Sequence, residues 1–76
     1  MSKAPKYNGK KCAFGGGDRT FVLRGNEATE TECISKCAGD SDCVAFSGIW
    51  NSWCIGCKSE LDEAHKGALA FIKDGN

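Results

Sequence analysis

Short segments rich in apolar residues recur along this chain, and residues 43–47 alternate apolar and small residues. Alternation with a period of two is typical of a strand that has one buried face. Segments of this kind, bounded by glycine and polar residues, predict strands at residues 7–14, 20–23, 43–47, 53–58 and 68–73. The three consecutive glycines at 15–17 predict a turn after the first strand, because glycine adopts positive backbone angles at little cost. Polar residues at 62–67 predict a loop or a single helical turn before the last strand.

One helix interrupts this series of strands, and its start signal lies at Thr29. Thr29 and Glu32 stand in the Ser/Thr-x-x-Glu relation of a capping box. A helix over residues 30–38 is therefore expected, closed by Gly39 in the left-handed conformation.

The helix carries two cysteines on one face. Cys33 and Cys37 are four residues apart, so both sulfurs emerge on the same side, which we expect to face the sheet. The predicted fold class is α+β, with one helix packed on a small and mostly antiparallel sheet.

The length and cysteine content predict one disulfide-stapled domain. A chain of 76 residues buries only about 60% of the surface that its unfolded form exposes, so its core is small. Six cysteines in such a chain are typical of small secreted domains held by disulfides. We expect a disordered arm at residues 1–6 and a single domain at 7–74. Because the polar start resembles no secretory leader, we expect a module of a longer secreted protein.

The charges are balanced and dispersed. Ten lysines and arginines match ten aspartates and glutamates, and the longest run of like charge is Lys10-Lys11. Binding to nucleic acid or to an anionic membrane requires a concentrated basic face. The charge pattern therefore argues against both partners.

Two cysteine chemistries compete with structural disulfides. The run from Trp53 to Lys58, Trp-Cys-Ile-Gly-Cys-Lys, is similar to the redox-active run of thioredoxins, but the chain is too short for their βαβ fold. A zinc site with four thiolates would use Cys33, Cys37, Cys54 and Cys57. The zinc hypothesis leaves two cysteines without a role, whereas three disulfides use all six.

A histidine and two carboxylates near Ser59 raise the alternative of hydrolytic catalysis. His65 lies close in sequence to Asp62 and Glu63, but a catalytic triad also needs an oriented pocket and an oxyanion hole. Such residues on one loop are ordinary surface residues in most proteins. We therefore expect no enzyme, no catalytic residue, no metal and no cofactor.

The spacing of cysteines and aromatic residues resembles that of the PAN/apple domain, an extracellular adhesion module. The similarity rests on Cys33-x3-Cys37-x5-Cys43-x2-Phe46, then Trp53-Cys54, Lys58 and Phe71-Ile72-Lys73, and it extends from Cys12 to Lys73. It implies a helix cradled by a curved antiparallel sheet of about five strands.

The same resemblance implies a disulfide pairing. It implies bonds Cys33–Cys54 and Cys37–Cys43, and we pair the remaining Cys12 with Cys57, which gives a nested connectivity. Apple domains proper also join their two termini by a disulfide. This sequence departs from that pattern, because no cysteine follows Cys57.

Within the family, the compact loops and the Cys54-x-x-Cys57 strand look most like the apple modules of apicomplexan microneme adhesins. Several of those modules bind galactose or N-acetylgalactosamine. The resemblance implies a secreted, lectin-like adhesion module, held in micronemes before release and used for attachment to host-cell glycans. The alternative is an apple module that binds another adhesin through Trp50 and Tyr7, without sugar binding.

The candidate sugar site is the polar segment before the last strand. A sugar site needs charged or amide groups for adjacent hydroxyls and an aromatic ring for the apolar face of the pyranose. The candidate residues are Lys58, Asp62, Glu63, His65, Lys66, Gly67, Phe71 and Tyr7, with Trp50 as a further candidate ring. The competing interpretation is that this segment is a solvated turn and that the aromatic residues fill the core. Trp53 and Phe46 are expected in the core, because they lie in strands beside cysteines that face the helix.

Overall fold

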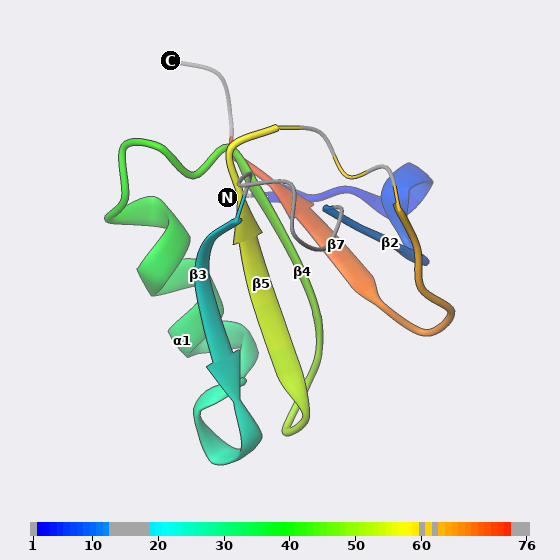
Figure 1. The fold of residues 1–76 in the computed structure, drawn as a ribbon, viewed down its shortest axis with the longest axis horizontal. Helices are drawn as coiled ribbons and strands as arrows, with labels where there is room; N and C mark the ends of the chain where they lie inside the picture. The colour runs from blue at the N-terminus through cyan, green and yellow to red at the C-terminus, as the bar shows by residue number, and fades with distance from the viewer. Residues whose placement is uncertain (1, 13–18, 60, 62, 74–76) are drawn as a thin grey trace.

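The computed structural model describes residues 2–12, 19–59, 61 and 63–73, which form one helix and two antiparallel sheets (Figure 1). The main sheet has five strands in the order β1-β7-β4-β5-β3. These strands are β1 (Ser2–Lys3), β7 (Leu69–Ile72), β4 (Ala45–Ile49), β5 (Trp53–Cys57) and β3 (Arg19–Arg24). The second sheet pairs β2 (Lys10–Lys11) with β6 (Glu63–Ala64), and this pair is called the β2–β6 ribbon below. The remaining elements are the helix α1 (Glu30–Ala38) and two 3-10 turns, η1 (Pro5–Tyr7) and η2 (Gly25–Glu27).

The helix begins and ends at the predicted residues. The hydroxyl oxygen of Thr29 accepts a hydrogen bond of 3.2 Å from the backbone N–H of Glu32, as a helix cap requires. The prediction for Gly39 is wrong, because its φ of −84° and ψ of −3° are right-handed. The chain continues in the right-handed sense after the helix, since the N–H of Asp40 donates to the carbonyl of Cys37 at 3.2 Å.

The face of the main sheet toward α1 is closed by cysteines and phenylalanines. Cys33 and Cys37 are fully buried there, and Cys33 forms a disulfide with Cys54 of β5. The rings of Phe46 and Phe71 stack with their centroids 4.8 Å apart. The helix thus covers this face of the sheet, which confirms the inward orientation predicted for its cysteine pair.

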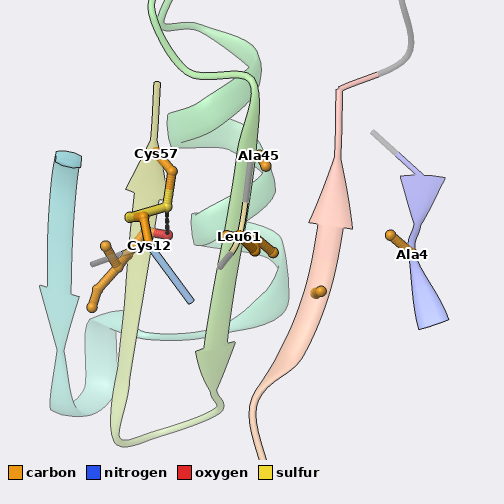
Figure 2. Close-up of a cluster of buried hydrophobic side chains, with 7 residues drawn as sticks. Ala4, Cys12, Ala45, Cys57 and Leu61 are labelled. Carbon is orange, nitrogen blue, oxygen red and sulfur yellow. Dashed lines mark hydrogen bonds between the residues drawn. A yellow bond between two sulfur atoms is a disulfide. The ribbon is translucent and has the colours of Figure 1, made fainter. Parts of the chain in front are cut away.

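The opposite face of the sheet carries a second buried cluster, shown in Figure 2. Its members come from the sheet, from the N-terminal segment and from the chain before β6: Ala4, Cys12, Ala45, Ile55, Cys57, Leu61 and Ala70. The β2–β6 ribbon is tied to this face because Cys12, directly after β2, is bonded to Cys57 at the end of β5. Two layers therefore pack on the sheet, one on each side.

The three disulfides have the predicted connectivity. They join Cys12 to Cys57, Cys33 to Cys54 and Cys37 to Cys43. Cys54 and Cys57 bond to different partners, so they do not form the disulfide of a redox motif. No cysteine is free, so the zinc hypothesis has no thiolate available.

The N-terminal segment differs from the expectation of a disordered arm followed by a long strand. Ser2–Lys3 pairs with β7 at the sheet edge, and Ala4 is buried with its N–H donating to the carbonyl of Ala70 at 2.9 Å. Pro5 then starts η1, because proline has a fixed φ and no N–H for further pairing. Among residues 7–12, the described part of the strand predicted at 7–14, only Lys10–Lys11 forms a strand, and residues 13–14 and the glycine turn at 15–17 lie outside the described residues.

The segment predicted as a loop or helical turn at 62–67 contains the short strand β6. Its partner β2 is distant in sequence, and a two-residue strand leaves no pattern that alternation can detect. None of the described helices is long and apolar enough to cross a membrane.

Candidate functional site

The candidate site is a groove on the sheet face opposite α1, at the side of β3 and β5. It is open to solvent and has a volume of about 230 Å³. Its lining comes from two strands of the main sheet and from the β2–β6 ribbon and its continuation: Lys11, Arg19, Val22, Arg24, Trp53, Ile55 and His65. This surface is called the Trp53 groove below.

The strand register explains why these side chains meet. Trp53 and Ile55 alternate with Cys54 along β5, so they point away from the helix to which Cys54 is bonded. In the pairing of β3 with β5, Arg24 lies opposite Trp53 and Val22 lies opposite Ile55. Opposite residues of paired strands share a face, so all four form the floor of the groove.

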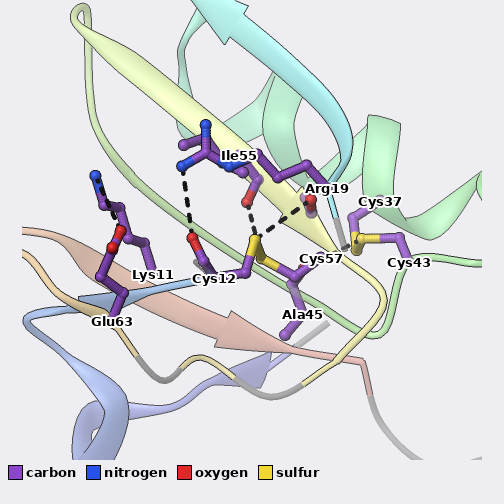
Figure 3. Close-up of a disulfide and its surroundings, with 10 residues drawn as sticks. Lys11, Cys12, Arg19, Cys37, Cys43, Ala45, Ile55, Cys57 and Glu63 are labelled. Carbon is purple, nitrogen blue, oxygen red and sulfur yellow. Dashed lines mark hydrogen bonds and ion pairs between the residues drawn. A yellow bond between two sulfur atoms is a disulfide. The ribbon is translucent and has the colours of Figure 1, made fainter. Parts of the chain in front are cut away.

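The β2–β6 ribbon provides the wall of the groove. Lys11 of β2 pairs in register with Glu63 of β6, and their side chains form an ion pair of 3.5 Å. A guanidinium nitrogen of Arg19 donates to the carbonyl of Cys12 at 3.5 Å, next to the Cys12–Cys57 disulfide (Figure 3). These contacts connect the ribbon to the edge strand β3 of the main sheet.

Trp53 is the central side chain of this site. It is half-buried and packs against the buried cluster beneath it. The His65 ring meets it edge-on, with centroids 4.8 Å apart and an angle of 67°, and the Lys11 ammonium lies 5.7 Å from its centroid. Such contacts hold an aromatic ring in place, and they put a cation over its face and an imidazole beside it.

The position of Trp53 corrects the expectation that it lies in the core beside its cysteine. Phe46 is fully buried on the helix face, as predicted. Trp53 lies on the other face, because the residue next to a helix-facing cysteine in a strand must point in the opposite direction. The alternation was visible in the sequence and would have identified this ring.

The described lining of the groove is cationic. Lys11, Arg19 and Arg24 contribute positive charge, and no carboxylate is among the described lining residues. Glu63 borders the groove and pairs with Lys11, whose side chain is 19% exposed while that of Glu63 is 42% exposed. Glu63 is the more exposed partner, so solvent partly screens this ion pair.

Two of the predicted sugar-site residues meet at this groove. His65 lines it and Glu63 borders it, each through contact with another residue of the site. Lys66 and Gly67 are exposed in the turn after His65, outside the lining. Asp62 lies outside the described residues.

The other predicted site residues lie elsewhere. Lys58 follows the far end of β5, about 16 Å from Trp53 at ~3.3 Å per strand residue. Phe71 is 4% exposed and stacks on Phe46 at the helix face. Tyr7 is half-buried against the same cluster as Trp53, but it does not line the groove. The predicted set is therefore divided between both faces of the sheet.

A second cavity, also of about 230 Å³, lies at the opposite edge of the main sheet. Its lining is Lys3, Pro5, Asn8, Glu30, Leu69, Ala70 and Phe71. The Asn8 side-chain oxygen already accepts a hydrogen bond of 3.0 Å from the N–H of Ala70. Trp50, a candidate ring at the sequence level, packs in the helix-face cluster with centroids 6.3 Å from Phe46 and 6.1 Å from Phe71.

The sequence interpretation missed most of the groove. Lys11, Arg19, Val22 and Arg24 gave no signal, because their convergence depends on which strands become neighbours. Among the described residues, no group of three or more His, Cys, Asp and Glu side chains is arranged to hold a metal ion.

A scan against protein-family models and searches of curated proteins and of solved structures found no match to this chain. The chemistry of the groove therefore carries the functional argument.

Proposed function

We propose that this chain is a secreted carbohydrate-binding module of the PAN/apple type, and that it binds galactose-type sugars in the Trp53 groove. The observation that carries this proposal is a half-buried tryptophan in a groove of about 230 Å³, with the Lys11 ammonium over its ring and the His65 imidazole in contact with it. The cavity is smaller than the ~300–1,000 Å³ of pockets for drug-sized ligands, and this size suits a single sugar ring.

Galactose suits an aromatic floor because of its stereochemistry. Its axial 4-hydroxyl lies on one side of the ring, which leaves a continuous patch of C–H groups on the other side. That patch can rest on the indole of Trp53, while the hydroxyls face the ammonium of Lys11 and the imidazole of His65. N-acetylgalactosamine presents the same C–H patch.

The fold supports the PAN/apple part of the proposal. A helix over a five-stranded antiparallel sheet and the nested disulfides Cys12–Cys57, Cys33–Cys54 and Cys37–Cys43 are what that resemblance implies. Three disulfides suit an oxidising, extracellular environment. Host-cell attachment and storage in micronemes rest on the sequence resemblance alone.

A single shallow groove on a small domain implies weak binding to one sugar. Useful affinity would come from several modules that engage several glycans, since linked sites raise the effective concentration of each other. Terminal galactose-type glycans on cell surfaces are the proposed partners.

Protein binding is the second candidate function, and one observation favours it. Leu69 is 41% exposed beside the second cavity, where an apolar side chain of a partner would be accommodated. This surface does not include the Trp53 groove. A partner protein that binds equally well in excess galactose would favour this candidate.

The two tryptophans allow a direct test, because they lie on opposite faces of the sheet. In Trp50→Phe the only indole is that of Trp53, and millimolar galactose or N-acetylgalactosamine should change its fluorescence. In the matched control Trp53→Phe the remaining Trp50 lies in the helix-face cluster, so its emission should stay constant. Equal responses in both variants, or no response in Trp50→Phe together with unchanged amide shifts in the groove, would overturn the proposed site.

A further inference from the structure

We infer that the natural ligand of the Trp53 groove is an acidic saccharide, with a sulfate or carboxylate group on the sugar. This inference rests on the proposed function and specifies its ligand class. Its starting point is the charge of the lining, in which Lys11, Arg19 and Arg24 are accompanied by no carboxylate among the described residues.

Among the described residues, three cations line the groove while most carboxylates lie elsewhere, so the described charges are separated. The described carboxylates other than Glu63 belong to η2, to α1 and to the turn after α1: Glu27, Glu30, Glu32, Asp40 and Asp42. None of these five lines the groove. A neutral sugar does not require such a separation, whereas an acidic sugar gains from it.

Arg24 is the residue best placed to bind the acidic group. It lies opposite Trp53 in the register of β3 and β5, so the Cβ atoms of the two residues are about 4.5–5.5 Å apart. A substituent on a sugar that rests on Trp53 is then within reach of the guanidinium of Arg24. Arginine binds sulfate and carboxylate through two parallel N–H donors, a geometry that lysine lacks.

Lys11 and Arg19 define the other side of the groove. The Lys11 ammonium is shared between Glu63, at 3.5 Å, and the face of Trp53. The Arg19 guanidinium donates to the Cys12 carbonyl. Both cations are therefore held in place before a ligand arrives, and their field adds to that of Arg24.

The test compares galactose, galactose 6-sulfate, galacturonic acid and inorganic sulfate, each titrated into the Trp50→Phe variant at low salt. We expect at least one acidic sugar to bind about tenfold more tightly than galactose, which corresponds to ~1.4 kcal/mol. This gain should decrease as NaCl is raised, because the Debye length falls from about 30 Å at 0.01 M to about 3 Å at 1 M.

Arg24→Gln and Lys36→Gln, each made in this Trp50→Phe background, form the matched pair of variants. Arg24→Gln should reduce the ratio of acidic-sugar to galactose affinity about tenfold, because a neutral amide replaces the guanidinium. Lys36 is exposed on α1, at the other face of the sheet, and its replacement should leave that ratio unchanged.

The outcomes distinguish a failure of the acidic-saccharide inference from a failure of the proposed function. If galactose binds and neither acidic sugar binds more tightly, the inference is wrong and the proposed function stands. If inorganic sulfate binds as tightly as the sulfated sugar, the groove is an anion site and the acidic-saccharide inference is overturned. If no sugar binds, both are overturned.

Discussion

At the scale of single residues, the side chain of Trp53 is directed by its neighbour. Cys54 must face α1 to bond with Cys33, and this requirement turns Trp53 to the other side of β5. Space for Cys54 comes from Gly48, which lies opposite it in the pairing of β4 with β5. A Cβ atom at Gly48 would lie 2.6 Å from the Cβ of Cys54 and 2.6 Å from the carbonyl oxygen of Trp53. One disulfide and one glycine thus support the orientation of the aromatic ring.

Gly48→Ala should destabilise the protein by about 1–3 kcal/mol, because the added methyl group overlaps with β5 and the core has no room to relax. Gly39→Ala is the control, since Gly39 has a right-handed conformation and its nearest contact would be the Ser35 carbonyl at 3.3 Å. The control should change stability by less than about 1 kcal/mol. Guanidinium denaturation with intact disulfides measures both, and equal losses would contradict this account.

At the scale of elements, α1 depends on signals within its own segment. The Thr29 cap satisfies the N–H of Glu32, and the acidic residues Glu30 and Glu32 lie in the first turn with Lys36 in the last. These charges oppose the partial charges of the helix ends. The strands differ, because their pairing, apart from that of β4 with β5, joins segments that are distant in the chain. The two-residue strands β2 and β6 exist only through that pairing.

Thr29→Ala should lower the free energy of unfolding by about 1 kcal/mol, because the N–H of Glu32 loses its acceptor. Thr29→Ser retains a hydroxyl and should restore most of this loss. Thr31→Ala is the matched control in the same turn, since Thr31 is exposed within the helix and alanine has the higher helix propensity. A loss at position 31 as large as that at position 29 would exclude capping as the cause.

At the scale of the whole molecule, each disulfide joins a different pair of segments. Cys33–Cys54 joins α1 to the sheet, and Cys37–Cys43 closes the turn after the helix. Cys12–Cys57 joins the β2–β6 ribbon to the other face, beside the Trp53 groove (Figure 3). The groove is therefore formed between the main sheet and the β2–β6 ribbon, and the Cys12–Cys57 disulfide joins these two layers.

Removal of Cys12–Cys57 by two alanine substitutions should cost about 4 kcal/mol, because the bond closes a loop with a sequence separation of 45. Removal of Cys37–Cys43 should cost only about 2 kcal/mol, because its separation is 6. In Trp50→Phe backgrounds, loss of Cys12–Cys57 should also shift the Trp53 emission and weaken sugar binding. Loss of Cys37–Cys43 should leave both signals unchanged, and the reverse pattern would exclude the ribbon as the wall of the site.

The sequence by itself determined the features that depend on short-range physics. The capped helix from Glu30 to Ala38 follows from hydrogen bonds and charges within one segment, and the positions of the longer strands follow from alternation. The disulfide pairing followed from the resemblance to a cysteine pattern rather than from such signals. Of the residues predicted for a sugar site from the polar segment before the last strand, His65 lines the Trp53 groove and Glu63 borders it.

Only the tertiary structure decided which strands are neighbours, because pairing between distant segments leaves no local signal. The order β1-β7-β4-β5-β3 places Arg24 beside Trp53, and the β2–β6 ribbon brings Lys11 over the same ring. Lys58 and Phe71 are near His65 in the sequence but not at the groove, because Lys58 follows the far end of β5 and Phe71 packs on the helix face of the sheet. The site is assembled from β2, β3, β5 and the turn after β6, so its chemistry exists only once these segments have packed together.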